Sequence, residues 1–266
     1  MKSSYLFLTH SNLNQPDVWK RFFSGHEGEY SIFCHPQAPE LVTDPLLRDR
    51  IVSNVVPTQP GTVSVITATL NLIRDAYADP ENAYFILASE SCIPIYSFSV
   101  VQNAIRQAGG RIFRHYRDDS NEAPRRWASL PKPRLVKYRE FRKQSQWMIF
   151  DRTLAALFLE HDITPLFERV YASDEHYFIN LLVSLGFPLN EIPSRPSTFV
   201  NWKEREFVRT ILSHPGIGEN VPWVKSRPKT YTELSLEDVA AARSTGALLM
   251  RKIAPECDCS ALEQSP

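Results

Sequence analysis

The stretch Phe85-Ile-Leu-Ala-Ser-Glu-Ser-Cys-Ile-Pro-Ile95 carries most of the information about the fold. It begins inside an unbroken apolar run, residues 84–87, which is typical of a strand buried on both faces and of a parallel or mixed sheet. A polar tip, Ser89-Glu90-Ser91, follows this strand. Ligands of open α/β sheets bind at the carboxyl ends of strands, so Glu90 and Ser91 are candidate binding residues. The alternative is a capping turn in which one serine holds a backbone N–H group.

Strand and helix patterns alternate around this stretch. Apolar residues at three- and four-residue spacing give the segment 62–77 one amphipathic face, and Gly109-Gly110 ends the helix that follows the central strand. The alternation predicts an α/β fold with a parallel sheet covered by helices. The expected elements are strand 5–9, helix 15–24, strand 29–34, helix 62–77, strand 84–88 and helix 97–108.

The rest of the chain is less regular. Residues 111–143 are dense in charge and rich in proline, and we expect them to form a long loop over the site. Residues 173–186 predict a helix with Ser173 as its N-cap and two acids in its first turn. No repeat or linker interrupts the chain, which predicts one domain over residues 1–266. The other expected elements are strand 147–150, helix 152–161, helix 235–244 and strand 246–253.

Composition excludes several classes of protein. The 266 residues include 30 Lys and Arg and 30 Asp and Glu, and the pI is about 7.1, so we expect no nucleic-acid binding and no broad polyanion binding. The four cysteines give no disulfide framework, and Cys257-Asp-Cys259 has no second pair to complete a zinc site. The apolar run at Tyr5 is too short for a signal peptide or a membrane span, so we expect an intracellular, cytoplasmic protein.

Several blocks of the sequence resemble the core-2/I-branching glycosyltransferases, especially their plant relatives. The tip Ser89-Glu-Ser-Cys-Ile-Pro94 is similar to a motif of that family, and the opening from Leu6 to Ile32 is similar to its first strand, helix and second strand. The blocks follow the family's order and span residues 5–255. The remaining blocks are Arg142-Lys-Gln-Ser-Gln-Trp147, Ser173-Asp-Glu-His-Tyr-Phe178, Phe199-Val-Asn-Trp202 and Arg251-Lys-Ile-Ala-Pro255.

The resemblance implies a GT-A-like fold, a Rossmann-like mixed sheet flanked by helices in a single domain. It implies inverting transfer of N-acetylglucosamine, xylose or glucuronate from a UDP-sugar to a hydroxyl of a glycan acceptor. Residues 1–110 would be the nucleotide-sugar-binding half, residues 111–255 the acceptor and catalytic half, and residues 256–266 a tail. Golgi members carry a membrane anchor and a stem, and we expect neither in this chain. We therefore expect a bacterial or viral member in the cytoplasm, which is the host cytoplasm for a virus.

Glu175 is the candidate catalytic base. An inverting transfer needs a base for the proton of the acceptor hydroxyl, and the resemblance places the family's catalytic glutamate in this block. The N-terminal end of a helix also favours the ionised form that a base requires. One alternative is plain helix capping by Ser173 with first-turn acids. A metal site that includes His176 is another, but neighbouring residues of a helix point their side chains in different directions.

Basic residues near the end of the chain are candidates for the donor diphosphate. The family uses a lysine at the place of Lys252, next to Arg251, and an arginine near Arg227, although Lys229 could replace Arg227. Two fixed cations stabilise the charge that grows on the leaving group. No Asp-x-Asp motif follows the central strand, so we expect no metal ion and no other cofactor. The alternative is that these cations lie on the surface in solvent.

Further residues are expected to contact the acceptor or the nucleotide. Asp118 and Asp119 resemble the family's acceptor-side acids and would act with Arg126 and Trp127, although exposed loop acids are often only solvated. Aromatic faces stack on sugar rings, and Trp147 and Trp202 match acceptor-side positions; core packing is the alternative for Trp147. The uridine is expected to lie against Thr9, His10 and His35, where the family often has an aspartate in place of His35.

Two other functions fit the same resemblance. A glycan-binding protein could keep the fold without turnover, although binding alone requires no base such as Glu175. A nucleotide-sugar hydrolase would use the same donor with water as the acceptor. Release of UDP with and without an acceptor distinguishes the three activities.

Overall fold

The strand after which the polar tip was expected lies in the middle of the fold. β3 (Asn82–Ser89) belongs to a four-stranded sheet with the order β2-β1-β3-β7. β1 (Lys2–Thr9) pairs in parallel with both β2 (Tyr30–Pro36) and β3, whereas β7 (Ile149–Asp151) is antiparallel to β3. The sheet is therefore mixed, as the resemblance implied, and not purely parallel, as the alternation of elements predicted. The computed structural model describes residues 1–214 and 218–264.

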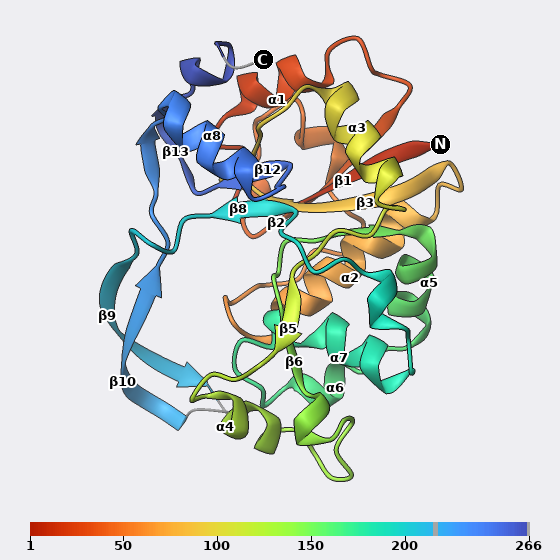
Figure 1. Cartoon of the computed structure of the whole chain (residues 1–266), viewed down its shortest axis with the longest axis vertical. Helices are drawn as coiled ribbons and strands as arrows, with labels where there is room; N and C mark the ends of the chain where they lie inside the picture. Colours follow the sequence, from red (N-terminus) through yellow and green to blue (C-terminus); the bar gives the residue numbers. More distant parts are fainter. Residues whose placement is uncertain (215–217, 265–266) are drawn as a thin grey trace.

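Helices cover both faces of this sheet (Figure 1). α1 (Pro16–Phe23) and α3 (Phe98–Gln107) lie on one face, and α2 (Val63–Tyr77) and α5 (Arg152–Glu160) lie on the other. Successive side chains of a strand point to opposite faces. Ile86 accordingly packs with the residues of α1 and α3, while Phe85 and Leu87 pack with those of α2 and α5. Burial on both sides explains the unbroken apolar run of β3.

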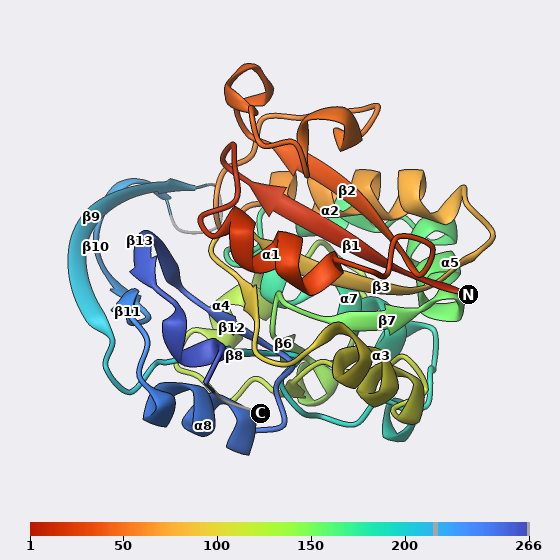
Figure 2. The same ribbon diagram turned by 90° about the horizontal axis from the view of Figure 1, so that it is seen from above.

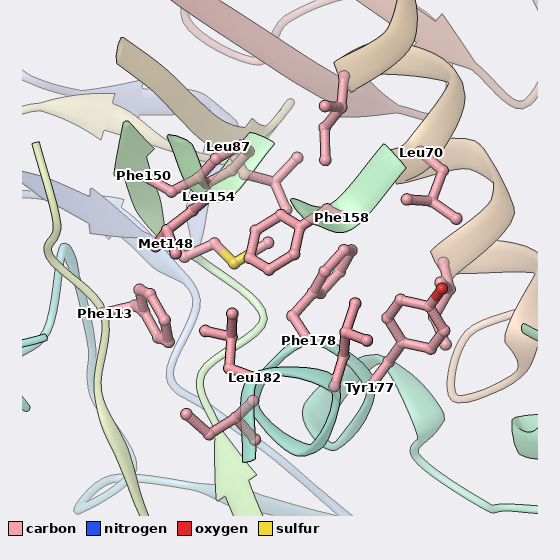
Figure 3. Close-up of a cluster of buried hydrophobic side chains, with 14 of the residues drawn as sticks. Leu70, Leu87, Phe113, Met148, Phe150, Leu154, Phe158, Tyr177, Phe178 and Leu182 are labelled. Atoms are coloured by element: carbon pink, nitrogen blue, oxygen red, sulfur yellow. The ribbon is translucent and has the colours of Figure 1, made fainter. Parts of the chain in front are cut away.

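The larger core cluster lies between the sheet, α2, α5 and α7 (Tyr177–Ser184) (Figure 3). The ring of Phe158 lies 5.3 Å from that of Phe150 and 4.8 Å from that of Phe178, measured between centroids. Burial of one such side chain stabilises the fold by about 1.5–3 kcal/mol. This cluster fixes α7, and with it the position of the residues immediately before the helix, which include Glu175.

A second sheet brings the end of the chain to the tip of β3. Its order is β4-β12-β8: β12 (Leu249–Arg251) is antiparallel to β4 (Ile93–Pro94) and parallel to β8 (Thr198–Val200). β13 (Ile253–Asp258) pairs with β11 (Tyr231–Glu233), and α8 (Leu236–Ser244) lies beside them. The predicted strand 246–253 is thus two strands that meet at Lys252.

The prediction that residues 111–143 form one long loop is wrong. This segment contains β5 (His115–Arg117), α4 (Ala123–Ala128) and β6 (Arg142–Gln144), and β5 and β6 form an antiparallel pair. The pair pins both ends of the segment together beside α7, as Figure 1 shows. The strands have three residues each, too few to show a period in the sequence.

The prediction of one helix from Ser173 is also wrong. Ser173–Glu175 form a 3₁₀ turn, and α7 begins only at Tyr177. The Ser173 hydroxyl is buried without a hydrogen-bond partner among the described residues, so it does not cap the helix. Ala172, before the turn, has a left-handed φ of 54°, which non-glycine residues rarely adopt. Glu175 therefore lies on a tight turn rather than in a helix.

A long β-hairpin was not predicted. β9 (Glu206–His214) and β10 (Gly218–Arg227) form a two-stranded ribbon that both views show running along one side of the molecule (Figures 1 and 2). No helix in the described ranges is long and apolar enough to cross a membrane. The remaining helical elements are α6 (Thr164–Phe167) and short 3₁₀ turns at Pro39–Leu41, Arg48–Arg50, Tyr138–Glu140, Leu189–Glu191 and Ser260–Leu262.

Candidate active site

Three distant parts of the chain meet at the carboxyl end of β3. The backbone N–H of Asn14 donates to the carbonyl of Glu90 at 2.9 Å, and its side-chain amide donates to the carbonyl of Ile253 at 2.7 Å. The N–H of Ile253 in turn donates to the carbonyl of Ser91 at 3.0 Å. These bonds hold the predicted tip, Glu90 and Ser91, against the basic pair Arg251-Lys252. The edge of the sheet where a ligand was expected is thus lined by both groups.

Arg251 is the most unusual cation of this edge. Its guanidinium lies over the ring of Trp147, 4.4 Å from the centroid, and its buried Nε has no hydrogen-bond partner among the described residues. Burial lowers the pKa of Arg251, while the nearby Cys92 and Glu90 oppose that shift. A buried donor without an acceptor costs free energy. An anionic ligand that accepts from Arg251 would remove this cost.

Lys252 follows at the junction between β12 and β13. Its carbonyl accepts from the N–H of Tyr231 at 2.8 Å, and its side chain is partly exposed. The alternative cation, Lys229, is paired with Glu204 at 2.9 Å. Arg227 is exposed at the end of β10 and forms no ion pair with any residue in the described ranges. Of these two, Arg227 remains the available cation.

Trp147 and Trp202 lie in different environments. Trp147 is only 6% exposed, and its ring contacts the Arg251 guanidinium, so packing accounts for its position. Trp202 is 46% exposed, directly after β8, beside a turn in which the Asn201 side chain accepts the backbone N–H groups of Lys203 and Glu204. Of these two tryptophans, Trp202 is the one with an exposed ring.

The three residues predicted to contact the nucleotide differ in their exposure to solvent. His10 is exposed at the end of β1, and Thr9 is buried with its hydroxyl donating to the carbonyl of Ser11 at 2.9 Å. His35 is 1% exposed, and its Nε2 accepts the N–H of Val56 at 3.0 Å. Burial lowers the pKa of His35, consistent with a neutral ring. Of the three, His10 alone is open to solvent.

The turn that carries Glu175 is held by the end of the loop that precedes α2. The N–H of Ala172 donates to the carbonyl of Gly61 at 2.9 Å, and the N–H of Glu175 donates back to the carbonyl of Ala172 at 3.0 Å. Gly61 has φ +79°, and a Cβ there would lie 3.3 Å from the ring of Tyr171. Glycine at this position lets the loop approach the turn closely. The turn leaves the Glu175 side chain 33% exposed.

Lys143 is a site residue that the sequence analysis did not select. Its ammonium lies 2.8 Å from Oε2 of Glu175, and its side chain is 22% exposed. Burial is the largest single influence and lowers the pKa of Lys143, but the charge and the hydrogen bond of Glu175, together with Tyr116, outweigh it, so the pKa is raised. Lys143 lies in the quoted block 142–147, four residues before Trp147. One short segment therefore contacts both the candidate base and, through Trp147, the cation Arg251.

Asp118 and Arg126 are close to each other, but they are buried. Oδ2 of Asp118 lies 3.4 Å from Nη1 of Arg126 and 3.6 Å from Nε2 of His176, and Asp118 is 3% exposed. The ring of His176 stacks on Phe141, and its Nδ1 donates to the carbonyl of Arg142 at 2.8 Å. Burial lowers the pKa of His176 to about 4, so the ring is neutral near pH 7. This buried cluster packs beside the turn that carries Glu175 and helps to hold that turn in place.

The other two predicted acceptor residues lie at the surface of the same segment. Asp119 is exposed and pairs with Arg117 at 3.2 Å. Trp127 donates its Nε1–H to the carbonyl of Val136 at 2.9 Å, with Arg134 stacked 4.1 Å from its ring centroid. Trp127 therefore fixes the loop after α4. The described residues contain no group of three or more His, Cys, Asp or Glu side chains arranged to hold a metal ion.

Comparison with known proteins identifies the family of this chain. The family model described as Core-2/I-Branching enzyme matches residues 4–240. The rice protein "Glycosyltransferase BC10" (Oryza sativa subsp. japonica) is 29% identical over 176 residues, which are 62% of this chain and 42% of the rice protein. The match thus takes in less than half of that relative's length. Because the family model covers most of the chain, including β3, Glu175 and the block 142–147, this protein belongs to the core-2/I-branching enzyme family.

Proposed function

We propose that this chain is an inverting glycosyltransferase with a GT-A-like fold. It would move a sugar from a UDP-sugar to a hydroxyl of a glycan, with N-acetylglucosamine, xylose or glucuronate as the sugar. The observation that carries the proposal is Glu175: a partly exposed carboxylate with one oxygen held by Lys143 at 2.8 Å. Membership of the family and the similarity to a protein named as a glycosyltransferase support it.

The proposed chemistry uses Glu175, which contacts Lys143, and Arg251, which contacts Trp147. Glu175 takes the proton of the acceptor hydroxyl while the oxygen attacks the anomeric carbon from the face opposite the leaving group. The bond between that carbon and the phosphate oxygen breaks, and its electron pair leaves with UDP. Arg251 and Lys252, with Arg227 as a third cation, stabilise the charge on the diphosphate. We propose that these cations take the place of a metal ion.

Substitution of the base tests the proposal. Glu175→Gln keeps the shape of the side chain and removes its basicity, so turnover is expected to fall by about 10²–10⁴ with nearly unchanged donor affinity. The measurement is UDP release and product formation from a panel of UDP-sugars, with and without acceptor. Retention of more than a tenth of wild-type turnover would rule out Glu175 as the base.

The same assay distinguishes the alternatives. UDP release that does not depend on acceptor, with free sugar as the product, would identify a nucleotide-sugar hydrolase. Donor and glycan binding without any UDP release would identify a glycan-binding protein. Either result would replace the transferase proposal.

A further inference from the structure

The charge of this chain is unevenly distributed. The chain as a whole has 30 basic and 30 acidic residues, but the segment 111–143 has eleven Lys and Arg against four Asp and Glu. The expectation of no broad polyanion binding rested on the overall balance and does not describe this segment. A local excess of one charge raises the local concentration of oppositely charged ligands.

The segment borders the candidate base. The β5–β6 pair sets Tyr116 opposite Lys143, and Lys143 contacts Glu175. The next pair sets Arg117 directly opposite Arg142, and like charges in such a position destabilise a sheet. Successive side chains of a strand point to opposite faces, so this pair adds positive charge on the face of the β5–β6 ribbon opposite Lys143, where Arg117 also pairs with Asp119 at 3.2 Å.

Several of these cations are not neutralised by neighbouring acids. Arg114, Lys132 and Lys137 are exposed and form no ion pair within the described part of the chain. Of the four acids, Asp118 is buried, Asp119 alone is exposed, and Glu122 and Glu140 are partly covered. The charge of these three cations therefore faces solvent.

Exposed aromatic rings accompany the cations. Tyr116 is 42% exposed with the Arg114 guanidinium 5.6 Å from its ring centroid, and Tyr138 is 38% exposed between Lys137 and Arg139. Tyrosine combines an apolar ring face, on which sugar rings stack, with a polar hydroxyl. Rings next to cations suit sugars that carry negative groups.

We propose that the acceptor is an acidic glycan, bearing carboxylate, sulfate or phosphate groups, and that the segment 111–143 binds it. The inference rests on the proposed function, because that function makes the neighbourhood of Glu175 the acceptor side. Each exposed ion pair contributes little, so several cations act together and the binding weakens as salt screens them.

The first experiment measures binding of matched glycan pairs that differ only in charge. The pairs are an oligogalacturonide and its methyl ester, dextran sulfate and dextran, and phosphomannan and its dephosphorylated form. We expect the charged member of at least one pair to bind about tenfold or more tightly than its neutral partner, with affinity falling as salt rises. The pair that responds identifies the acidic group. Equal binding within all three pairs overturns the proposal, as does a single-stranded DNA that binds as tightly as the best glycan.

The second experiment removes charge from the segment. The triple variant Arg114→Gln, Lys132→Gln, Lys137→Gln is expected to weaken binding of the charged glycan about five- to fiftyfold. The matched control is Lys20→Gln, Arg21→Gln, Arg48→Gln, which removes the same charge from exposed positions in and near α1 and the turn at Arg48–Arg50. Equal losses in the two triple variants, or no loss in the first, overturn the proposal.

Failure here is distinct from failure of the proposed function. Glycan binding is measured without donor and requires no turnover, whereas the transferase proposal is judged by UDP release and by Glu175→Gln. An active transferase that binds neutral and charged glycans alike refutes only the acidic acceptor. A protein without turnover that still selects charged glycans refutes only the transferase.

Discussion

A carboxylate that serves as a base must stay ionised and keep one oxygen available for the incoming hydroxyl. In Glu175 the ammonium of Lys143 holds Oε2 at 2.8 Å, which leaves Oε1 to accept the proton. The two residues come from β6 and from the turn before α7, so the contact also joins two elements. Lys143 does not need to touch the substrate for this role. It is a positioning residue that acts through Glu175.

Lys143→Met tests this role because it removes the charge and keeps a long apolar side chain. We expect kcat to fall about 10- to 100-fold with little change in the donor KM, since a misplaced base slows the chemical step. Lys143→Arg is expected to restore part of the activity. In the Glu175→Gln background, Lys143→Met is expected to cost almost nothing, because the partner on which it acts is already gone.

The matched control is Lys2→Met. Lys2 is similarly covered, with its side chain 26% exposed, and it pairs with Glu81 at 2.6 Å in a part of the fold away from Glu175. This control should leave kcat unchanged. A loss from Lys143→Met that is equally large in the Glu175→Gln background would show a purely structural role for Lys143.

At the scale of elements, the turn at Ser173–Glu175 shows the limit of local sequence signals. A serine followed by two acids before an apolar run indicates a helix N-terminus, yet the helix begins two residues after Glu175. The competing influence is tertiary: Gly61 accepts the N–H of Ala172, and the buried His176 lies against β6. The block containing Glu175 could be identified from the sequence, but neither the turn nor Lys143 as its partner could.

The His176 ring connects α7, β6 and the segment before α4, and it predicts a pH dependence of stability. Its pKa is about 4 in the folded protein, because of burial, against 6.5 in the unfolded chain. The unfolded state therefore binds more protons between these values, so this contribution is present above pH 6.5 and is lost as pH falls toward 4. The charged groups that face the ring are Asp118, Arg126 and Glu175.

From pH 7 to pH 5 this single group should lower the free energy of unfolding by about 2 kcal/mol. The measurement is urea unfolding at the two pH values for the wild type and His176→Asn. The variant is expected to be less stable at pH 7 but to lose less stability on acidification. His26→Asn, at a partly exposed histidine paired with Glu29, is the control. An unchanged pH dependence in His176→Asn would contradict the assignment.

At the scale of the whole molecule, the elements with long apolar segments could be predicted from the sequence, whereas the pairings between short strands could not. β1, β2, β3 and the helices between them were predicted because each buries enough side chains to show an apolar run or a helical period. β4, β8 and β12 have two or three residues each and pair with strands far away in the sequence. Their pairing brings Arg251 to the tip of β3, and the sequence placed it there only through resemblance to a family.

This long-range assembly supports the last prediction, transfer without a divalent ion. Mg²⁺ and Mn²⁺ bind through carboxylate oxygens beside the phosphates, whereas the tip of β3 offers one acid, Glu90, next to Arg251 and Lys252. Lys252→Ala should cost roughly 2–4 kcal/mol in the transition state, as expected for loss of one preorganised donor. The measurement is transfer in excess EDTA and in Mn²⁺ with the same donor and acceptor, and equal rates are expected. Activity that EDTA abolishes and Mn²⁺ restores would contradict the prediction and would make Glu90 the first ligand to test, because a metal ion would then stabilise the charge that we assign to Arg251 and Lys252.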